Sequence, residues 1–323
     1  MNQSKPMYLK KKWINRQVYE YFSVNIAPLL GWRAPILVYQ MGKVGSSSIR
    51  NSLFRCQDPR TRLVLMCHEF FPIRNRDPGN IDIEPEYKEY VVREMEHDRR
   101  VFEQFTLRQR LGWLFRKKFY TERIYRAYVQ PGGQVRVITL VRDPVAHNIS
   151  LFFQVFGQYT GTTIEESGYG IDEMIRIFLD RYAYYRPLIW LDAELKTTLG
   201  IDVYKSPFPL DKGYAIMSRD NISLLVLKCE LDDQSKTDAI KEFLGLEDFE
   251  IVRSNVTSQK SHAKQYQEFK QRIVIPAPLL DKMYESKFAK HFYSADDRAR
   301  LRAHWGGRSA DLEHDGAGTI DTR

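Results

Sequence analysis

The chain is poor in cysteine and lacks any long apolar run. Its three cysteines, Cys56, Cys67 and Cys229, are too few and too scattered for a disulfide framework, and no C-x-x-C pair suggests a zinc site. The basic start of the chain has no apolar stretch of signal-peptide length, and no later segment approaches the roughly 20 apolar residues of a membrane span. We therefore expect a protein of a reducing compartment, located in the cytoplasm.

Low-complexity blocks and internal repeats are also absent from the body of the chain, which is typical of an ordinary globular protein. A chain of 323 residues, 43% of them hydrophobic, can bury a substantial core. We expect one domain over residues 35–305. A basic helical segment over residues 1–34 precedes it, and a flexible tail over residues 306–323, rich in Gly, Asp, Ser and Thr, follows it.

The chain carries an excess of positive charge. Its formal net charge of +8 favours a polyanionic partner, which could be a nucleotide, an acidic glycan, nucleic acid or a membrane surface. One helix-prone stretch contains the basic residues 116–118, with Arg108, Arg110, Arg123 and Arg126 nearby. These residues could contact an anionic saccharide or a membrane surface, but a solvated helix face explains them more simply.

Short apolar and β-branched runs alternate with helix-prone sequence. Strands are expected at residues 36–40, 62–67, 135–141 and 224–227. Helical sequence is expected at about residues 144–153, 171–195, 237–244 and 296–305. This alternation predicts a three-layer α/β/α fold around a mainly parallel sheet. The charged stretch at about residues 86–130 is expected to add two or three helices outside the sheet, as a helical insertion.

The first predicted strand ends in a glycine-bearing loop, Gly42-Lys43-Val44-Gly45-Ser46-Ser47-Ser48, and a helical pattern follows it. Such a loop presents backbone N–H groups and the positive end of a helix dipole to one point, which suits an anion. An ordinary strand-to-helix turn is the plainer alternative. Because Lys43 precedes the second glycine, the order differs from G-x-x-x-x-G-K-[ST], which weakens a kinase or ATPase assignment.

The loop resembles the 5′-phosphosulfate loop of the sulfotransferases that use 3′-phosphoadenosine 5′-phosphosulfate (PAPS). In that family a later strand ends in an Arg, often followed by Asp or Asn and Pro, with a Ser eight residues beyond the Arg, and both bind the 3′-phosphate. Arg142-Asp143-Pro144 and Ser150 have this spacing. The donor-binding residues that the resemblance implies are Gly42, Lys43, Val44, Gly45, Ser46, Ser47, Ser48, Arg142 and Ser150.

The same resemblance implies a P-loop-containing nucleotide-hydrolase-like sulfotransferase fold, with PAPS as co-substrate and adenosine 3′,5′-bisphosphate as product. Glu230-Leu231-Asp232 stands near the place where the family has an E-D-L sequence. Lys260 and Ser261 lie where related enzymes have a loop over the adenosine, although a solvated loop is equally consistent with them.

Other segments look like a bacterial branch of this superfamily labelled "putative capsular polysaccharide synthesis proteins". These segments are residues 190–195, 200–204 and 207–208. The branch implies a glycan made for the cell surface as the acceptor. The residues themselves leave open a polysaccharide, a lipid-linked sugar, a small metabolite or a protein tyrosine.

Sulfuryl transfer is an in-line displacement in which negative charge grows on the leaving oxygen, and Lys43 is expected to stabilise it. We expect no metal. An acceptor hydroxyl must also lose a proton, for which His68, directly after the second strand, is the first candidate and Glu69 the reserve. His68 could equally cap or pack a strand end. His147, between Arg142 and Ser150, could face the nucleotide, but we assign it to a helix surface, without a role.

Two other classes of function remain open. A P-loop kinase of a sugar or nucleoside would share the strand, loop and helix but would need ATP and magnesium. A non-catalytic polyanion-binding module would use the basic surface alone and would bind DNA or heparin in a salt-sensitive way. A nucleic-acid partner is not expected if the sulfotransferase resemblance holds.

Overall fold

The computed structural model describes residues 16–32, 34–70, 83–103, 105–114, 120–252 and 262–307. Its centre is a five-stranded sheet with the order β2-β1-β3-β5-β4. The strands are β1 Ile36–Tyr39, β2 Val64–Cys67, β3 Val135–Val141, β4 Tyr214–Arg219 and β5 Ile222–Lys228. The neighbouring strands pair in parallel, except that β4 runs antiparallel to β5 at the edge.

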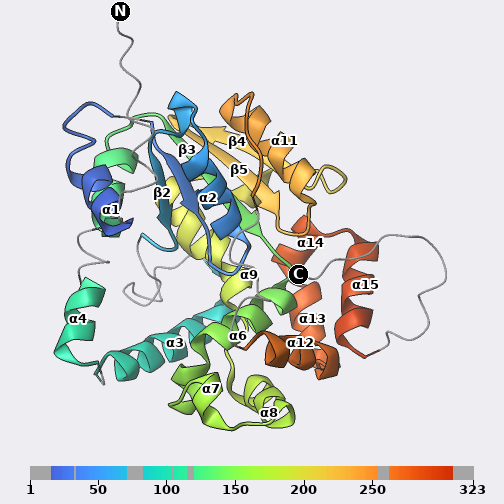
Figure 1. The fold of residues 1–323 in the computed structure, drawn as a ribbon. Coiled ribbons are helices and arrows are strands. Elements are labelled where there is room, and N and C mark those ends of the chain that lie inside the picture. Colours follow the sequence, from blue (N-terminus) through green and yellow to red (C-terminus); the bar gives the residue numbers. More distant parts are fainter. Residues whose placement is uncertain are drawn as a thin grey trace, which may run out of the picture.

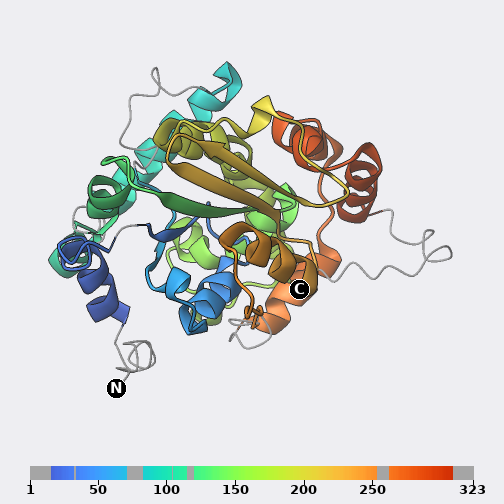
Figure 2. The ribbon, with the colours of Figure 1, turned by 90° about the horizontal axis from the view of Figure 1, so that it is seen from above.

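Helices cover both faces of the sheet, which is why every side chain of β1 is buried. Helices α2 (Ser46–Arg55) and α11 (Asp233–Leu244) lie on one face (Figures 1 and 2). On the other face lie α9 (Arg186–Trp190) and the wider-wound turns of η7 (Leu191–Lys196). The prediction of an α/β fold around a mainly parallel sheet is therefore confirmed.

The remaining helices flank the sheet or lie below its carboxyl edge. The segment that follows β2 forms α3 (Pro85–Glu103), α4 (Leu107–Leu114), α5 (Glu122–Ile124) and η6 (Tyr125–Val129), outside the sheet as predicted. The other helical elements are α1 (Arg16–Asn25), α6 (Pro144–Thr160), α7 (Ile164–Ser167), α8 (Ile171–Arg181), α10 (Thr197–Leu199), α12 (Ala263–Arg272), α13 (Ala277–Tyr284), α14 (Lys287–Phe292), α15 (Ala295–Trp305) and the short turns η2 (Pro59–Thr61) and η8 (Val203–Lys205).

A cluster of aromatic rings holds the helices below the sheet together. In Figure 1, α6, α8, α12 and α13 lie below the edge at which the parallel strands end. Phe152 on α6 is fully buried at the centre of the cluster and makes ring contacts with Phe178 of α8 and Phe269 of α12. Aromatic pairs of this kind contribute beyond the area they bury. The cluster therefore fixes α6, the helix that directly follows β3, against the carboxyl edge of the sheet.

The first residues of α6 are held by a buried carboxylate. Asp143, 3% exposed, caps the helix by accepting hydrogen bonds from the backbone N–H groups of Val145 and Ala146. Its two oxygens also accept from the Tyr284 hydroxyl at 2.7 Å and from the Trp305 indole N–H at 2.8 Å. Groups from three helices thus fix the residue that follows Arg142.

Removing one of these donors should destabilise the fold. Tyr284→Phe leaves one lone pair of the buried Asp143 without its partner, and we expect it to lower the free energy of unfolding by about 2 kcal/mol. Tyr214→Phe is the matched control, because the Tyr214 hydroxyl donates to the exposed Glu242, where water can replace it. Urea denaturation gives the free energy of unfolding of both variants. Equal losses in the two variants would show that the hydrogen bond to the buried Asp143 stabilises the fold no more than an exposed one.

Candidate functional site

The predicted loop joins β1 to α2 in an unusual backbone conformation. Gly42, Lys43 and Gly45 all have positive φ, at 84°, 55° and 78°. This is ordinary for glycine but strained for lysine, because its Cβ crowds the backbone. Gly45 occupies the N-cap position of α2, which has no side-chain cap among the described residues. The positive end of the helix dipole therefore faces the loop, and its N-cap residue supplies no side-chain acceptor.

Arg142 meets this loop. Its guanidinium donates a hydrogen bond of 2.8 Å to the carbonyl oxygen of Lys43, across 99 residues of sequence. The end of β5 also lies here, because a Cβ added to Gly45 would come within 3.3 Å of the Cys229 sulfur. The carboxyl ends of β1, β3 and β5 therefore converge on the loop, as a parallel sheet requires.

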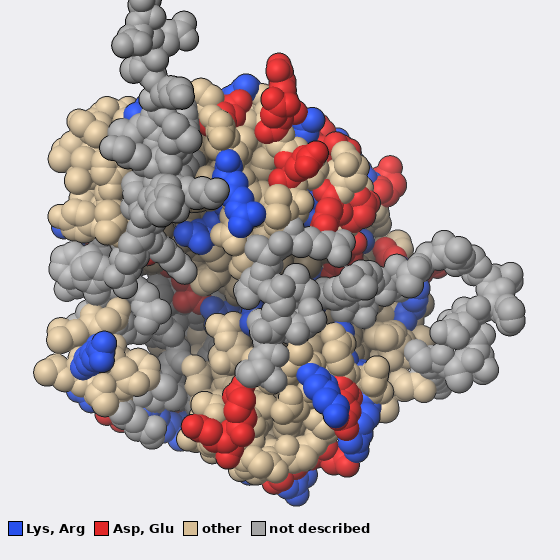
Figure 3. Space-filling view, in the orientation of Figure 1, with Lys and Arg blue, Asp and Glu red and all other residues tan. Residues whose placement is uncertain are grey.

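Arg142 is well supported as a cation. Burial alone would lower its pKa, but the neighbouring Cys229, Tyr266 and Glu230 outweigh burial and raise it. Glu230 in turn accepts from the backbone N–H of Asp143 at 2.7 Å. The guanidinium is thus a fixed positive charge beside the loop. In Figure 3, Lys and Arg side chains lie over α2, while acidic side chains gather over α11.

The other residues predicted to bind PAPS are not brought to the loop in the way that Arg142 is. Helix α6 begins at Pro144, directly after Asp143, so Ser150 lies about 9 Å further along the helix axis. Because the helix starts at Pro144, no loop after Arg142 brings Ser150 towards the group that Arg142 would bind. In the described part of the chain, no hydrogen bond joins Arg142 and Ser150. Lys260 and Ser261 lie outside the described residues.

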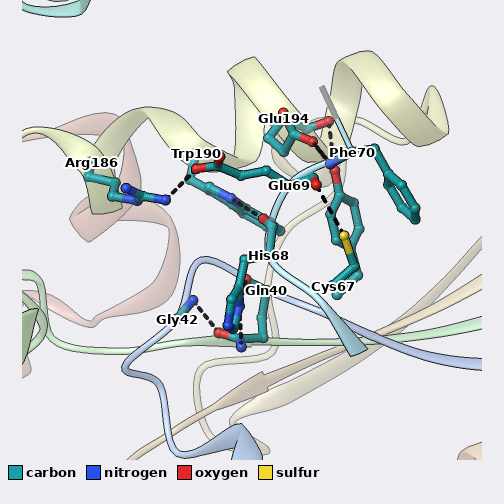
Figure 4. A network of polar contacts seen from close by, with 10 residues as sticks. Gln40, Gly42, Cys67, His68, Glu69, Phe70, Arg186, Trp190 and Glu194 are labelled. Carbon is teal, nitrogen blue, oxygen red and sulfur yellow. Dashed lines mark hydrogen bonds and ion pairs between the residues drawn. The ribbon is translucent and has the colours of Figure 1, made fainter. Parts of the chain in front are cut away.

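His68 stands beside the loop, as the sheet topology predicts. A Cβ added to Gly42 would lie 4.0 Å from both Cε1 and Nδ1 of the His68 ring (Figure 4). Nδ1 lies 2.9 Å from the Gln40 side-chain nitrogen and 3.0 Å from the Gln40 carbonyl oxygen. The Gln40 side-chain oxygen accepts from the backbone N–H of Gly42. Gln40 therefore couples the orientation of the His68 ring to the loop.

The segment that follows β2 is anchored to the helix on the far face of the sheet (Figure 4). The His68 carbonyl oxygen accepts from the Trp190 indole N–H at 3.1 Å, and Glu194 accepts from the backbone N–H of Phe70 at 2.6 Å. Glu69 forms an ion pair with Arg186. These contacts hold His68 and Glu69 on one rigid edge, and they engage the Glu69 carboxylate while the His68 side chain stays exposed.

His147 lies elsewhere than the sequence analysis predicted. The expectation that it lies on a helix surface is wrong, because His147 is 0% exposed and both ring nitrogens lack hydrogen-bond partners among the described residues. Burial, followed by the charges of Arg142 and Arg186, lowers its pKa to about 3. The Gly42 backbone and the Asn148 side chain oppose this shift, but neither makes a hydrogen bond to the ring. The ring is therefore neutral at physiological pH.

This burial predicts a pH effect on stability. In the unfolded chain His147 titrates at an ordinary value of 6.5, so the unfolded state gains a proton as the pH falls below 6.5 while the folded state does not until about 3. The free energy of unfolding should therefore fall by up to about 1.4 kcal/mol per pH unit across this range. Urea denaturation at several pH values should give a shallower dependence for His147→Asn, and identical slopes would contradict the burial.

No group of three or more His, Cys, Asp or Glu side chains in the described part of the chain could hold a metal ion. None of the described helices is both long and apolar enough to cross a membrane.

One comparison with known proteins gives a match. Residues 172–294 match a family described as "Putative capsular polysaccharide synthesis protein". No curated protein and no solved structure matches the chain. The matched segment runs from α8 to just beyond α14 and includes β4, β5 and the helix that carries Arg186, but neither the loop nor Arg142. The family description associates this part of the chain with capsular polysaccharide synthesis.

Proposed function

We propose that this chain is a sulfotransferase, which moves a sulfuryl group from PAPS to a hydroxyl or amine of a capsular or other cell-surface glycan, or of its precursor. The observation that carries the proposal is the contact between Arg142 and the Lys43 carbonyl. Two motifs that resemble donor-binding motifs of one family, and that lie far apart in sequence, meet at the open N-terminus of α2. The parallel pairing of β1 and β3 brings these strand ends together in any case, and what supports the proposal is that both ends carry residues resembling donor-binding motifs of one family.

The loop and Arg142 would bind the two ends of the donor. The N–H groups at the start of α2 suit the 5′-phosphosulfate, and the guanidinium suits the 3′-phosphate. The acceptor oxygen forms a bond to sulfur while the bond from sulfur to the bridging oxygen breaks. Lys43 then stabilises the negative charge that grows on the bridging oxygen.

His68 is the candidate base for the acceptor proton. It fits this role when its Nδ1–H donates to the Gln40 carbonyl oxygen, because Nε2 is then an acceptor. In the other tautomer Nδ1 accepts from the Gln40 side chain and Nε2 carries the proton, so it cannot act as base. Glu69 is the weaker candidate because Arg186 engages its carboxylate.

The glycan acceptor rests on the family match over residues 172–294. That segment contributes α9 and Arg186, which border the His68 side of the site. The part of the chain associated with capsular polysaccharide synthesis thus adjoins the proposed base, where an acceptor hydroxyl would have to approach.

Calorimetry with two ligands tests the proposal. We expect adenosine 3′,5′-bisphosphate to bind in the presence of EDTA, and ATP with magnesium to bind weakly. Transfer of label from ³⁵S-labelled PAPS to extracted capsular material would then identify the acceptor. Preference for ATP with magnesium would instead support a sugar or nucleoside kinase. Binding of neither nucleotide, with salt-sensitive binding of heparin, would support a polyanion-binding module.

A further inference from the structure

The buried His147 has no role in the site described so far. Native proteins pair almost all their buried polar atoms, so a ring with two unpaired nitrogens needs an explanation. Most of α6 up to Phe156 is buried by the sheet edge and the aromatic cluster, so the ring cannot simply turn out to solvent. The unpaired ring nitrogens therefore remain inside the protein, near the backbone of the loop.

Cationic groups surround this ring. Arg142 acts on it from the end of β3 and Arg186 from the start of α9, while the Gly42 backbone approaches from the loop and Asn148 from its own helix. The acidic groups near these arginines include Glu69, which forms an ion pair with Arg186, and Glu230 and Asp143, which act on Arg142. In the ligand-free protein a third positive charge at His147 is therefore disfavoured.

We propose that His147 takes up a proton from solvent when a ligand bearing phosphate or sulfate binds between the loop and Arg142, and releases it when that ligand leaves. This inference rests on the proposed function, because it assumes an anion at that position. The step forms one N–H bond on the imidazole and changes no other bond. His147 acts on the ligand through charge and is a positioning residue.

The expected change in the proton affinity of His147 follows from electrostatics. A negative charge about 5 Å from the ring, at an effective dielectric constant of about 20, raises its proton affinity at least about 100-fold. Binding would therefore raise the pKa of the ring from its value of about 3 in the ligand-free protein. By linkage, the affinity for the anion should then rise by up to about tenfold for each unit by which the pH falls, over the interval in which binding drives proton uptake. Product release would conversely be favoured at higher pH.

Calorimetry in pairs of buffers that differ in ionisation enthalpy counts the protons exchanged. The titrant is adenosine 3′,5′-bisphosphate, and the proteins are wild type, His147→Asn and His147→Gln, each between pH 5 and pH 8. The 3′-phosphate itself titrates near pH 6, so the difference between wild type and variant isolates His147. We expect wild type to take up about half a proton more than either variant at pH 5, and the difference to vanish near pH 8.

His291→Asn is the matched control. Burial also lowers the pKa of His291, but this ring lies against Tyr204 and Phe292, away from the loop. Its proton count should equal that of wild type. Nucleotide binding with the same proton count in wild type and in both His147 variants would overturn this inference and leave the proposed function standing. No nucleotide binding by wild type would overturn both.

A measurement on the unaltered protein covers the case in which both His147 variants misfold. The chain has seven histidines, whose ring carbons can be followed by NMR after labelling with ¹³C-histidine. We expect one ring that is neutral at pH 5 in the free protein to become cationic when the bisphosphate is added. If every ring keeps its charge state on addition of the bisphosphate, the inference is wrong.

Discussion

Arg142→Ala should weaken the binding of adenosine 3′,5′-bisphosphate by about 30-fold or more. The guanidinium is the fixed cation at the end of β3, and in the described part of the chain it donates a hydrogen bond to the Lys43 carbonyl oxygen. A charge-assisted contact to phosphate is worth about 2–5 kcal/mol when one partner is removed, which corresponds to a loss of about 30-fold to several thousand-fold. Titration calorimetry of wild type and variant measures the change directly.

Arg136→Ala is the matched control for this substitution. Arg136 lies on the same strand but near its opposite end, about 20 Å from Arg142. Removing its charge changes the net charge of the chain equally, so affinity should stay within about threefold of wild type. If both variants lose the same affinity, general charge attraction explains the binding and a discrete phosphate site at Arg142 does not.

The parts of this site that sequence reasoning found have strong local signals. The loop stands between a fully buried β1 and a helix, and β3 coincides with the predicted residues 135–141 because its run is mostly apolar and β-branched. Arg142 and His68 follow from one topological rule, that parallel strands end at one edge. Local pattern and topology together were enough to place them side by side.

The parts that were missed depend on tertiary contacts. Strand β4 is an edge strand that ends in polar residues, and only its pairing with β5 makes it a strand. His147 is buried because α6 is enclosed by the sheet edge and by rings such as Phe178 and Phe269, which no local period encodes. The Glu69–Arg186 pair joins residues that lie 117 positions apart. A single sequence carries no signal for such contacts.

Substitution of Lys43 should separate catalysis from stability. Lys43 has a φ of 55°, a conformation in which alanine is strained and glycine is not. We expect Lys43→Gly to be more stable to urea than Lys43→Ala by about 1 kcal/mol. Under the proposed function, both variants should nevertheless lose about 10²- to 10³-fold in kcat for sulfuryl transfer, because each removes the charge proposed to stabilise the leaving oxygen.

The affinity of the Lys43 variants for adenosine 3′,5′-bisphosphate should fall by less than about tenfold. The leaving oxygen gains its charge in the transition state, so an interaction made mainly there lowers kcat more than it weakens binding. Lys43→Arg keeps the charge and is expected to retain more turnover than either neutral variant. A Lys43→Gly protein with turnover near that of wild type would remove Lys43 from the mechanism. An equal loss of stability in Lys43→Gly and Lys43→Ala would contradict the strained conformation of the loop, whatever the turnover.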